Sequence, residues 1–83
     1  MSAVATAVRE ALRRHGRLST DPDRIDPQTD LFQLGFTSHA AVNLMLALED
    51  ALGVEFPDEL LTRDTFATIA RLDSDSEVIA LDR

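Results

Sequence analysis

The clearest helical pattern in the chain lies in residues 38–52, which read SHAAVNLMLALEDAL. The apolar residues of this stretch recur three and four positions apart and so form one stripe along a helix; they are Ala41, Leu44, Met45, Leu48 and Leu52. Thr37 or Ser38 can cap the start of the helix by accepting a hydrogen bond from a free backbone N–H. Gly53 tolerates a positive φ and ends the helix. The pattern therefore predicts a helix over about residues 38–52.

The segment before this helix combines a second amphipathic pattern with a long loop. Apolar residues at helical spacing predict a helix over about residues 3–15, with Gly16 as its stop; they are Val4, Ala7, Val8, Ala11 and Leu12. Residues 16–37 contain turn residues such as Asp21-Pro22, but also large apolar side chains: Leu18, Ile25, Leu31, Phe32, Leu34 and Phe36. We therefore expect this loop to be held across the core, with a short helical turn around residues 27–32.

The segment after Gly53 predicts two further helices. Pro57 can open a short helix over about residues 57–61. Asp64 or Thr65 then caps a last helix over about residues 65–80, whose inward side chains are Phe66, Ile69, Ala70, Leu72 and Ile79. Its far end contains the poor helix formers Asp73-Ser74-Asp75-Ser76. The sequence therefore predicts a single all-α domain over residues 1–83, a three- to four-helix bundle with a long first loop.

Composition and charge narrow the classes of partner. The 83 residues include 15 acidic and 8 basic side chains, every basic one is an arginine, and the formal net charge is −7. Such a balance argues against nucleic acids and anionic membranes, whose phosphates attract basic surfaces, and favours partners with basic docking surfaces. The sequence shows no signal-peptide pattern and no run of the ~20 apolar residues that a membrane span needs. We therefore expect a cytoplasmic protein that acts as a monomer without nucleic acid or membrane.

The residues that commonly carry catalysis or bind metals do not form a site of either kind. There is no Cys, which excludes disulfides, thiolate zinc sites and thiol catalysis. His15 and His39 lack the further ligands of a metal site. Ser38 and His39 are adjacent, point about 100° apart at a helix start and lack the glycines of a nucleophile elbow. We therefore predict no catalytic residue, no metal and no enzyme.

Ser38 gains its interest from the residues around it, because a lone Ser before an apolar run is usually only a helix cap. The string DLFQLGFTS at 30–38, followed by VNLMLALED at 42–50, resembles the acyl carrier protein family. In that family a Leu-Gly-x-Asp-Ser-Leu motif presents the Ser that receives 4′-phosphopantetheine. Residues 48–58, LEDALGVEFPD, resemble the family's Leu-Glu-x-x-Phe-Gly-x-x-Ile-Pro-Asp stretch, and residues 65–70 resemble the start of its last helix. The resemblance runs in order from Asp30 to Leu72.

The resemblance implies that Ser38 carries a covalent 4′-phosphopantetheine arm. Such an arm holds an acyl or aminoacyl group as a thioester on its own thiol and delivers it to partner enzymes, which explains how a carrier can lack Cys. A helix start suits the attachment, since its free N–H groups and partial positive charge tolerate a phosphodiester. The implied partners are a phosphopantetheinyl transferase and an amino acid:carrier protein ligase or another acyl-loading enzyme.

Departures from the family pattern bear on the cargo. Thr37 replaces the family's Asp and His39 its Leu, while Ala40 and Asn43 stand where fatty-acid carriers usually have acids. Motifs around Gly35-x-Thr37-Ser38, 42–46, 55–58 and 60–67 look instead like bacterial aminoacyl carrier proteins, which are charged by ligases resembling the core of seryl-tRNA synthetase and would carry a small amino acid. The resemblance places the partner surface at Phe36, Thr37, His39, Val42, Asn43, Leu46, Glu49, Asp50, Phe56 and Asp58.

Two other functions stay open on the residues alone. One is an acyl carrier of a fatty-acid, polyketide or non-ribosomal peptide pathway. The other is an unmodified acidic helical interaction module, in which Ser38 would be a helix cap and nothing more.

Overall fold

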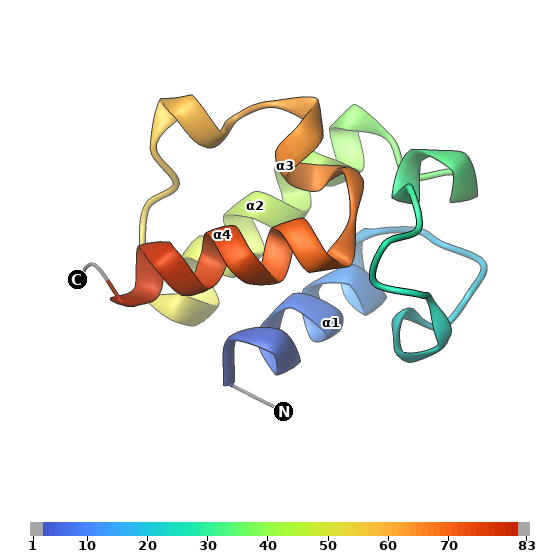
Figure 1. Ribbon diagram of the computed structural model, residues 1–83, viewed down its shortest axis with the longest axis horizontal. Helices are drawn as coiled ribbons and strands as arrows, with labels where there is room; N and C mark the ends of the chain where they lie inside the picture. The colour runs from blue at the N-terminus through green and yellow to red at the C-terminus, as the bar shows by residue number, and fades with distance from the viewer. Residues whose placement is uncertain (1–2, 82–83) are drawn as a thin grey trace.

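The computed structural model of the protein describes residues 3–81, which form helices and contain no strand (Figure 1). Its α-helices are α1 (Ala3–His15), α2 (Ser38–Leu52), α3 (Arg63–Ala67) and α4 (Ile69–Leu81). Three 3₁₀ turns lie between them, η1 (Pro22–Arg24), η2 (Leu31–Leu34) and η3 (Asp58–Leu60). The prediction of an all-α bundle with a long first loop is confirmed.

The core lies where α1 packs against both α2 and α4. Each of these three helices contributes aliphatic side chains that are almost completely buried: Val8, Leu12, Leu44, Leu48, Ile69 and Leu72. Phe36, Phe56 and Phe66 add the aromatic part of the core. Apolar burial of this kind is the main stabilising contribution in a small bundle, and most of it comes from residues of the predicted stripes.

The long loop between α1 and α2 is held across the core as its apolar residues predict. Ile25, Leu31 and Phe36 are all buried, and the backbone N–H of Ala70 at the start of α4 donates to the carbonyl of Pro27 at 3.0 Å. The helical turn expected around residues 27–32 lies further along, at η2. Asp30 explains the shift, because its carboxylate accepts the N–H of Phe32 at 2.9 Å and so caps a turn that begins at the next residue.

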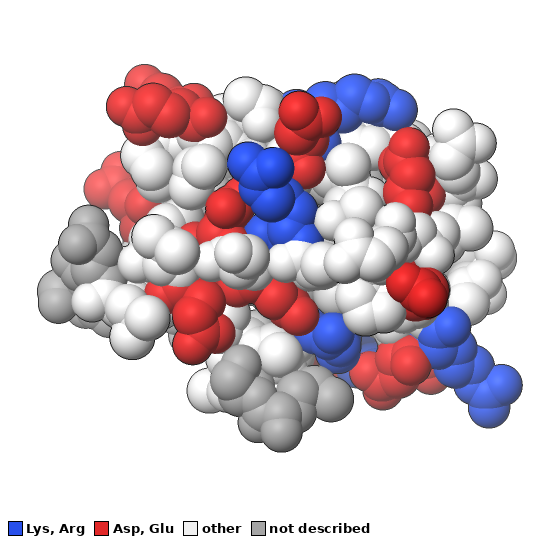
Figure 2. Space-filling model, viewed as in Figure 1, with Lys and Arg blue, Asp and Glu red and all other residues white. Residues whose placement is uncertain are grey.

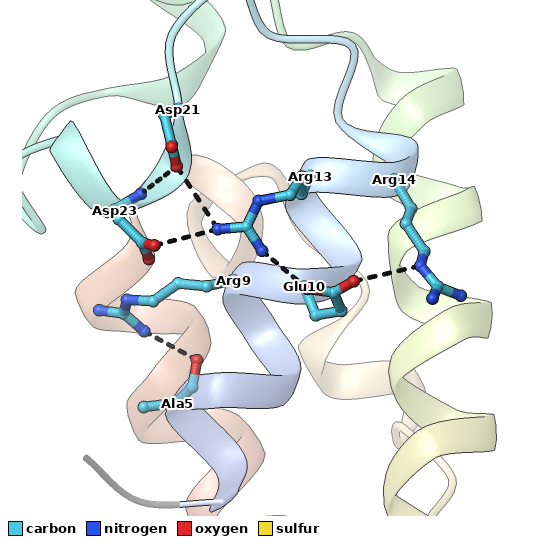
Figure 3. A network of polar contacts seen from close by, with 7 residues as sticks. All are labelled: Ala5, Arg9, Glu10, Arg13, Arg14, Asp21 and Asp23. Carbon is cyan, nitrogen blue, oxygen red and sulfur yellow. Dashed lines mark hydrogen bonds and ion pairs between the residues drawn. The ribbon is translucent and has the colours of Figure 1, made fainter.

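Charged side chains tie the first part of this loop to α1 (Figure 3). The Arg13 guanidinium contacts Glu10 at 2.7 Å on its own helix and reaches Asp23 at 3.0 Å and Asp21 at 3.4 Å in the loop. Asp21 also accepts the backbone N–H of Asp23 at 3.0 Å. That N–H first, and then the Arg13 charge, lower the pKa of the Asp21 carboxyl below its ordinary value of 3.8.

The two C-terminal helices differ from prediction. The short helix expected over 57–61 is the 3₁₀ turn η3, and the helix expected over 65–80 is divided into α3 and α4. Thr68 makes the division, because its backbone is extended (φ −136°, ψ 155°) and its Oγ1 accepts the N–H of Arg71 at 3.1 Å. The predicted caps Asp64 and Thr65 were also wrong, since Thr62 caps α3 by accepting the N–H of Thr65.

Candidate functional site

Thr37, and not Ser38, caps the start of α2. Its Oγ1 accepts the backbone N–H of Ala40 at 3.0 Å, and its backbone is extended in the manner of a cap residue. Ser38 is therefore the first residue inside the helix, and its hydroxyl has no part in holding the helix start. The sequence left the choice between these two residues open.

The Ser38 side chain lies exposed at the junction of the loop and α2. No hydrogen bond to its hydroxyl occurs within residues 3–81. The turn before it is built by Gly35, whose φ of 98° favours glycine, and by Phe36, which is 3% exposed and packs its ring 5.3 Å from that of Phe32. The turn therefore leaves the Ser38 hydroxyl exposed and free of hydrogen bonds within residues 3–81, directly after the buried Phe36 ring.

Ser38 lies at the rim of a groove of about 270 Å³ between α2, η2 and the start of α3. The other lining side chains are largely apolar and include Phe32, Val42, Met45, Leu61 and Phe66. Arg63 is the single charged residue of the lining, and its guanidinium carbon lies 3.8 Å from the centroid of the Phe32 ring. The groove therefore combines a nucleophilic oxygen, an apolar wall and a cation.

These residues fit a phosphodiester-linked arm. An uncommitted serine hydroxyl provides the point of attachment, the cation complements a phosphate, and the apolar wall complements an aliphatic chain. Within residues 3–81 no group of three or more His, Cys, Asp or Glu side chains could hold a metal ion, and no helix there is long and apolar enough to cross a membrane.

The predicted partner surface is only partly at the surface. Thr37, His39, Val42, Leu46, Asp50 and Asp58 are exposed, and Asn43 and Glu49 are half-buried. Phe36 and Phe56 are 3% and 6% exposed, which is a correction, because side chains in the core cannot contact a partner directly. The Glu49 carboxylate accepts the backbone N–H of Phe56 at 2.8 Å and thereby holds the segment after α2.

Sequence reasoning missed the far wall of the groove. Leu61, Thr62 and Arg63 line it, although the sequence offered them only as part of a family resemblance. Leu61 is 47% exposed, which is high for a large apolar residue, but the exposure of an apolar side chain cannot be recognised from the residue type alone.

On the face shown in Figure 2, acidic side chains are spread widely with basic ones set among them.

Comparison with known proteins agrees with this geometry. Residues 2–72 match the family model described as phosphopantetheine attachment site. The chain is 42% identical over 72 residues to an aminoacyl carrier protein of Agrobacterium fabrum, a match that covers 87% of each protein.

Solved structures add the three-dimensional likeness. The chain matches a carrier protein from Agrobacterium tumefaciens that was crystallised with an engineered Bradyrhizobium japonicum glycine:[carrier protein] ligase. With AMP present the TM-score is 0.83 at 40% identity, covering 88% of this chain and 97% of the other. With ATP it is 0.85 at 39% identity, covering 92% and 99%. A solution structure from Agrobacterium tumefaciens matches with a TM-score of 0.72 at 41% identity, covering 94% and 93%. The chain therefore belongs to the phosphopantetheine-attachment family of carrier proteins, whose members carry a prosthetic group and are not themselves catalysts.

Proposed function

We propose that the protein is an aminoacyl carrier whose 4′-phosphopantetheine arm is attached to Ser38. The observation that carries the proposal is the exposed Ser38 hydroxyl, free of hydrogen bonds within residues 3–81, beside a helix that Thr37 already caps. When bound, the arm supplies a thiol on which an amino acid is held as a thioester. The chain supplies the attachment oxygen, its orientation and a surface that partner enzymes recognise.

Attachment transfers the 4′-phosphopantetheinyl group of coenzyme A to Ser38. The Ser38 Oγ forms a P–O bond to the phosphorus that carries pantetheine, and the pyrophosphate bond of coenzyme A breaks. Adenosine 3′,5′-bisphosphate leaves, and the Ser38 proton passes to a base or to water in the transferase site. The exposed position of Ser38 allows the in-line approach that such a displacement needs.

The surface for the loading enzyme lies along α2. Val42 and Leu46 follow Ser38 at intervals of four residues, so all three lie on one side of the helix, and the two apolar side chains are 52% and 53% exposed. Apolar side chains this exposed are typical of contact surfaces, and a net charge of −7 favours a ligase with a basic rim. The likeness to a carrier bound to a glycine:[carrier protein] ligase supports a small amino acid as cargo. The carrier acts as a monomer in the cytoplasm, where coenzyme A is available for attachment of the arm and ATP for loading.

Intact mass after coexpression with a promiscuous phosphopantetheinyl transferase tests the attachment. We expect wild type and Ser74→Ala, which changes an exposed serine on α4, to gain one phosphopantetheine, and Ser38→Ala to gain none. If wild type gains no mass, or Ser38→Ala gains as much, Ser38 is not the attachment site and the unmodified interaction module becomes the better explanation.

Loading of the modified protein tests the cargo. With a glycine:[carrier protein] ligase, ATP and labelled amino acids, we expect the label to enter the protein and to be released by hydroxylamine, as a thioester is. Replacing Val42 and Leu46 by Ser should slow loading at limiting carrier concentration and leave attachment of the arm unchanged. Label transfer from malonyl or fatty-acyl donors alone would contradict the aminoacyl assignment.

A further inference from the structure

Arg63 is a cation without an anionic partner in the part of the chain that the structure describes. No hydrogen bond or ion pair to its guanidinium occurs within residues 3–81, whereas each arginine of α1 and α4 faces a carboxylate. Its guanidinium lies over the Phe32 ring, with 3.8 Å between the guanidinium carbon and the ring centroid. Arg63 is thus held in position while its charge stays uncompensated.

The stack on Phe32 leaves the hydrogen-bond donors of Arg63 free. A guanidinium that lies over an aromatic ring uses one face of its plane, while its N–H donors point outward within that plane. An anion at the edge of the group can therefore bind without breaking the stack. Because the ring already restricts the side chain, binding loses less conformational entropy than it would for a mobile arginine.

Arg63 and Ser38 line the same groove, so an anion attached to Ser38 would lie near the guanidinium. The groove has an apolar wall in Val42, Met45 and Leu61, and Arg63 is the only charged residue among those that line it. A phosphodiester formed on Ser38 brings one negative charge to the rim of this groove in a protein whose net charge is already −7. The aliphatic portion that follows the phosphate is tethered beside the apolar wall.

We propose that Arg63 binds the phosphodiester of the arm on Ser38 and that the pantetheine portion rests against Val42, Met45 and Leu61. This inference rests on the proposed function, since it requires an arm on Ser38. The groove, at about 270 Å³, lies near the lower limit for small-molecule sites and covers the arm only in part, so the arm can leave it for a partner enzyme. Arg63 is accordingly a positioning residue for the arm.

Nuclear magnetic resonance of the modified protein tests the proposal. Intact mass first shows whether the arm is attached. We then expect through-space contacts between the geminal methyl groups of pantetheine and the methyl groups of Val42, Met45 and Leu61. The phosphorus signal should differ from that of free phosphopantetheine and move toward it as salt is added.

Matched variants separate the charge of Arg63 from its stacking. Arg63→Gln should lower the contact intensities about two- to fivefold, as expected for loss of one exposed charge pair, and shift the phosphorus signal toward its free value. Arg63→Lys, which keeps the charge but lacks the planar face, should give an intermediate result. Arg24→Gln, an exposed arginine of η1 outside the groove, should match wild type. Amide spectra of each variant show whether the fold is kept.

Each contrary outcome has a distinct meaning. Absence of any mass gain overturns the proposed function and this inference with it. A modified protein whose arm contacts none of the three wall residues overturns this inference alone. Equal spectra for Arg63→Gln and Arg24→Gln overturn the role of Arg63. The NMR signals of Val42, Met45 and Leu61 could instead shift only when a ligase is added, or only as the carrier concentration rises. Either result would show that the groove binds a partner or a second copy of the chain, and would overturn this inference.

Discussion

At the residue scale, two neighbouring side chains have separate tasks. Thr37 caps the N-terminus of α2 by accepting a hydrogen bond from the Ala40 N–H, whereas the Ser38 hydroxyl makes no hydrogen bond within residues 3–81. Sequence patterns predict that one of the two is the cap, because both residue types suit the position. They cannot decide between them, since the decision depends on the backbone conformation, which is extended at Thr37 (φ −115°, ψ 163°) and helical from Ser38 onward.

Stability measurements distinguish the two tasks. Thr37→Ala removes the cap and should lower the free energy of unfolding by about 0.5–2 kcal/mol. Ser38→Ala should change it little, because an exposed first-turn alanine is a good helix former and no bond is lost. Urea unfolding followed by circular dichroism measures both. A larger loss for Ser38→Ala than for Thr37→Ala would show that the cap has been assigned to the wrong residue.

At the element scale, α4 shows how tertiary contacts maintain a helix of low propensity. Asp73 pairs with Arg9 of α1 at 3.1 Å, and Asp75 pairs with Arg71 of its own helix at 3.0 Å. Ser76 is completely buried, with no partner for its hydroxyl within residues 3–81. The residue types of this stretch predict a weak end to the helix, yet the helix runs on to Leu81. The two ion pairs and the burial of Ile69 and Leu72 support it, whereas the unpaired Ser76 hydroxyl opposes it.

The contact between α1 and the loop makes part of the stability depend on pH. The pKa of Asp21 is lowered on folding, so its contribution is present above its ordinary pKa of 3.8 and is lost as the pH falls through the lower value of the folded state. Asp21→Asn keeps an oxygen for the Asp23 N–H but removes the charge near Arg13.

Melting temperatures of the two proteins should show this dependence. The advantage of wild type over Asp21→Asn should shrink as the pH is lowered from about 6 to about 3. Asp50→Asn, which removes one carboxylate at an exposed position of α2, serves as the control. An advantage of wild type over Asp21→Asn that is constant across this range would contradict the role of the Asp21 charge.

At the scale of the whole molecule, local patterns predict the two long N-terminal helices and their buried faces, together with the apolar character of the first loop. They fail where two local structures compete, and where the outcome depends on residues far apart in the sequence. The break at Thr68 requires a threonine to prefer bonding to the Arg71 N–H over continuing a helix. The groove beside Ser38 requires Phe32 and Arg63, which are far apart in sequence, to meet across the bundle. Ser38 could be predicted as the attachment residue only from the resemblance to a known family, because the sequence does not distinguish a serine with a free hydroxyl from one that caps a helix.

The capping of α2 by Thr37 has a consequence for the behaviour of a mixed population. Because neither the helix start nor the exposed side chains of Val42 and Leu46 depend on the Ser38 oxygen, molecules without an arm fold alike and show the same α2 face. A ligase that recognises this face then meets bare molecules as competitors of those that bear an arm. The rate at which the ligase loads amino acid would follow the ratio of modified to unmodified carrier. Raising the amount of protein without raising the amount of attached phosphopantetheine would therefore slow loading.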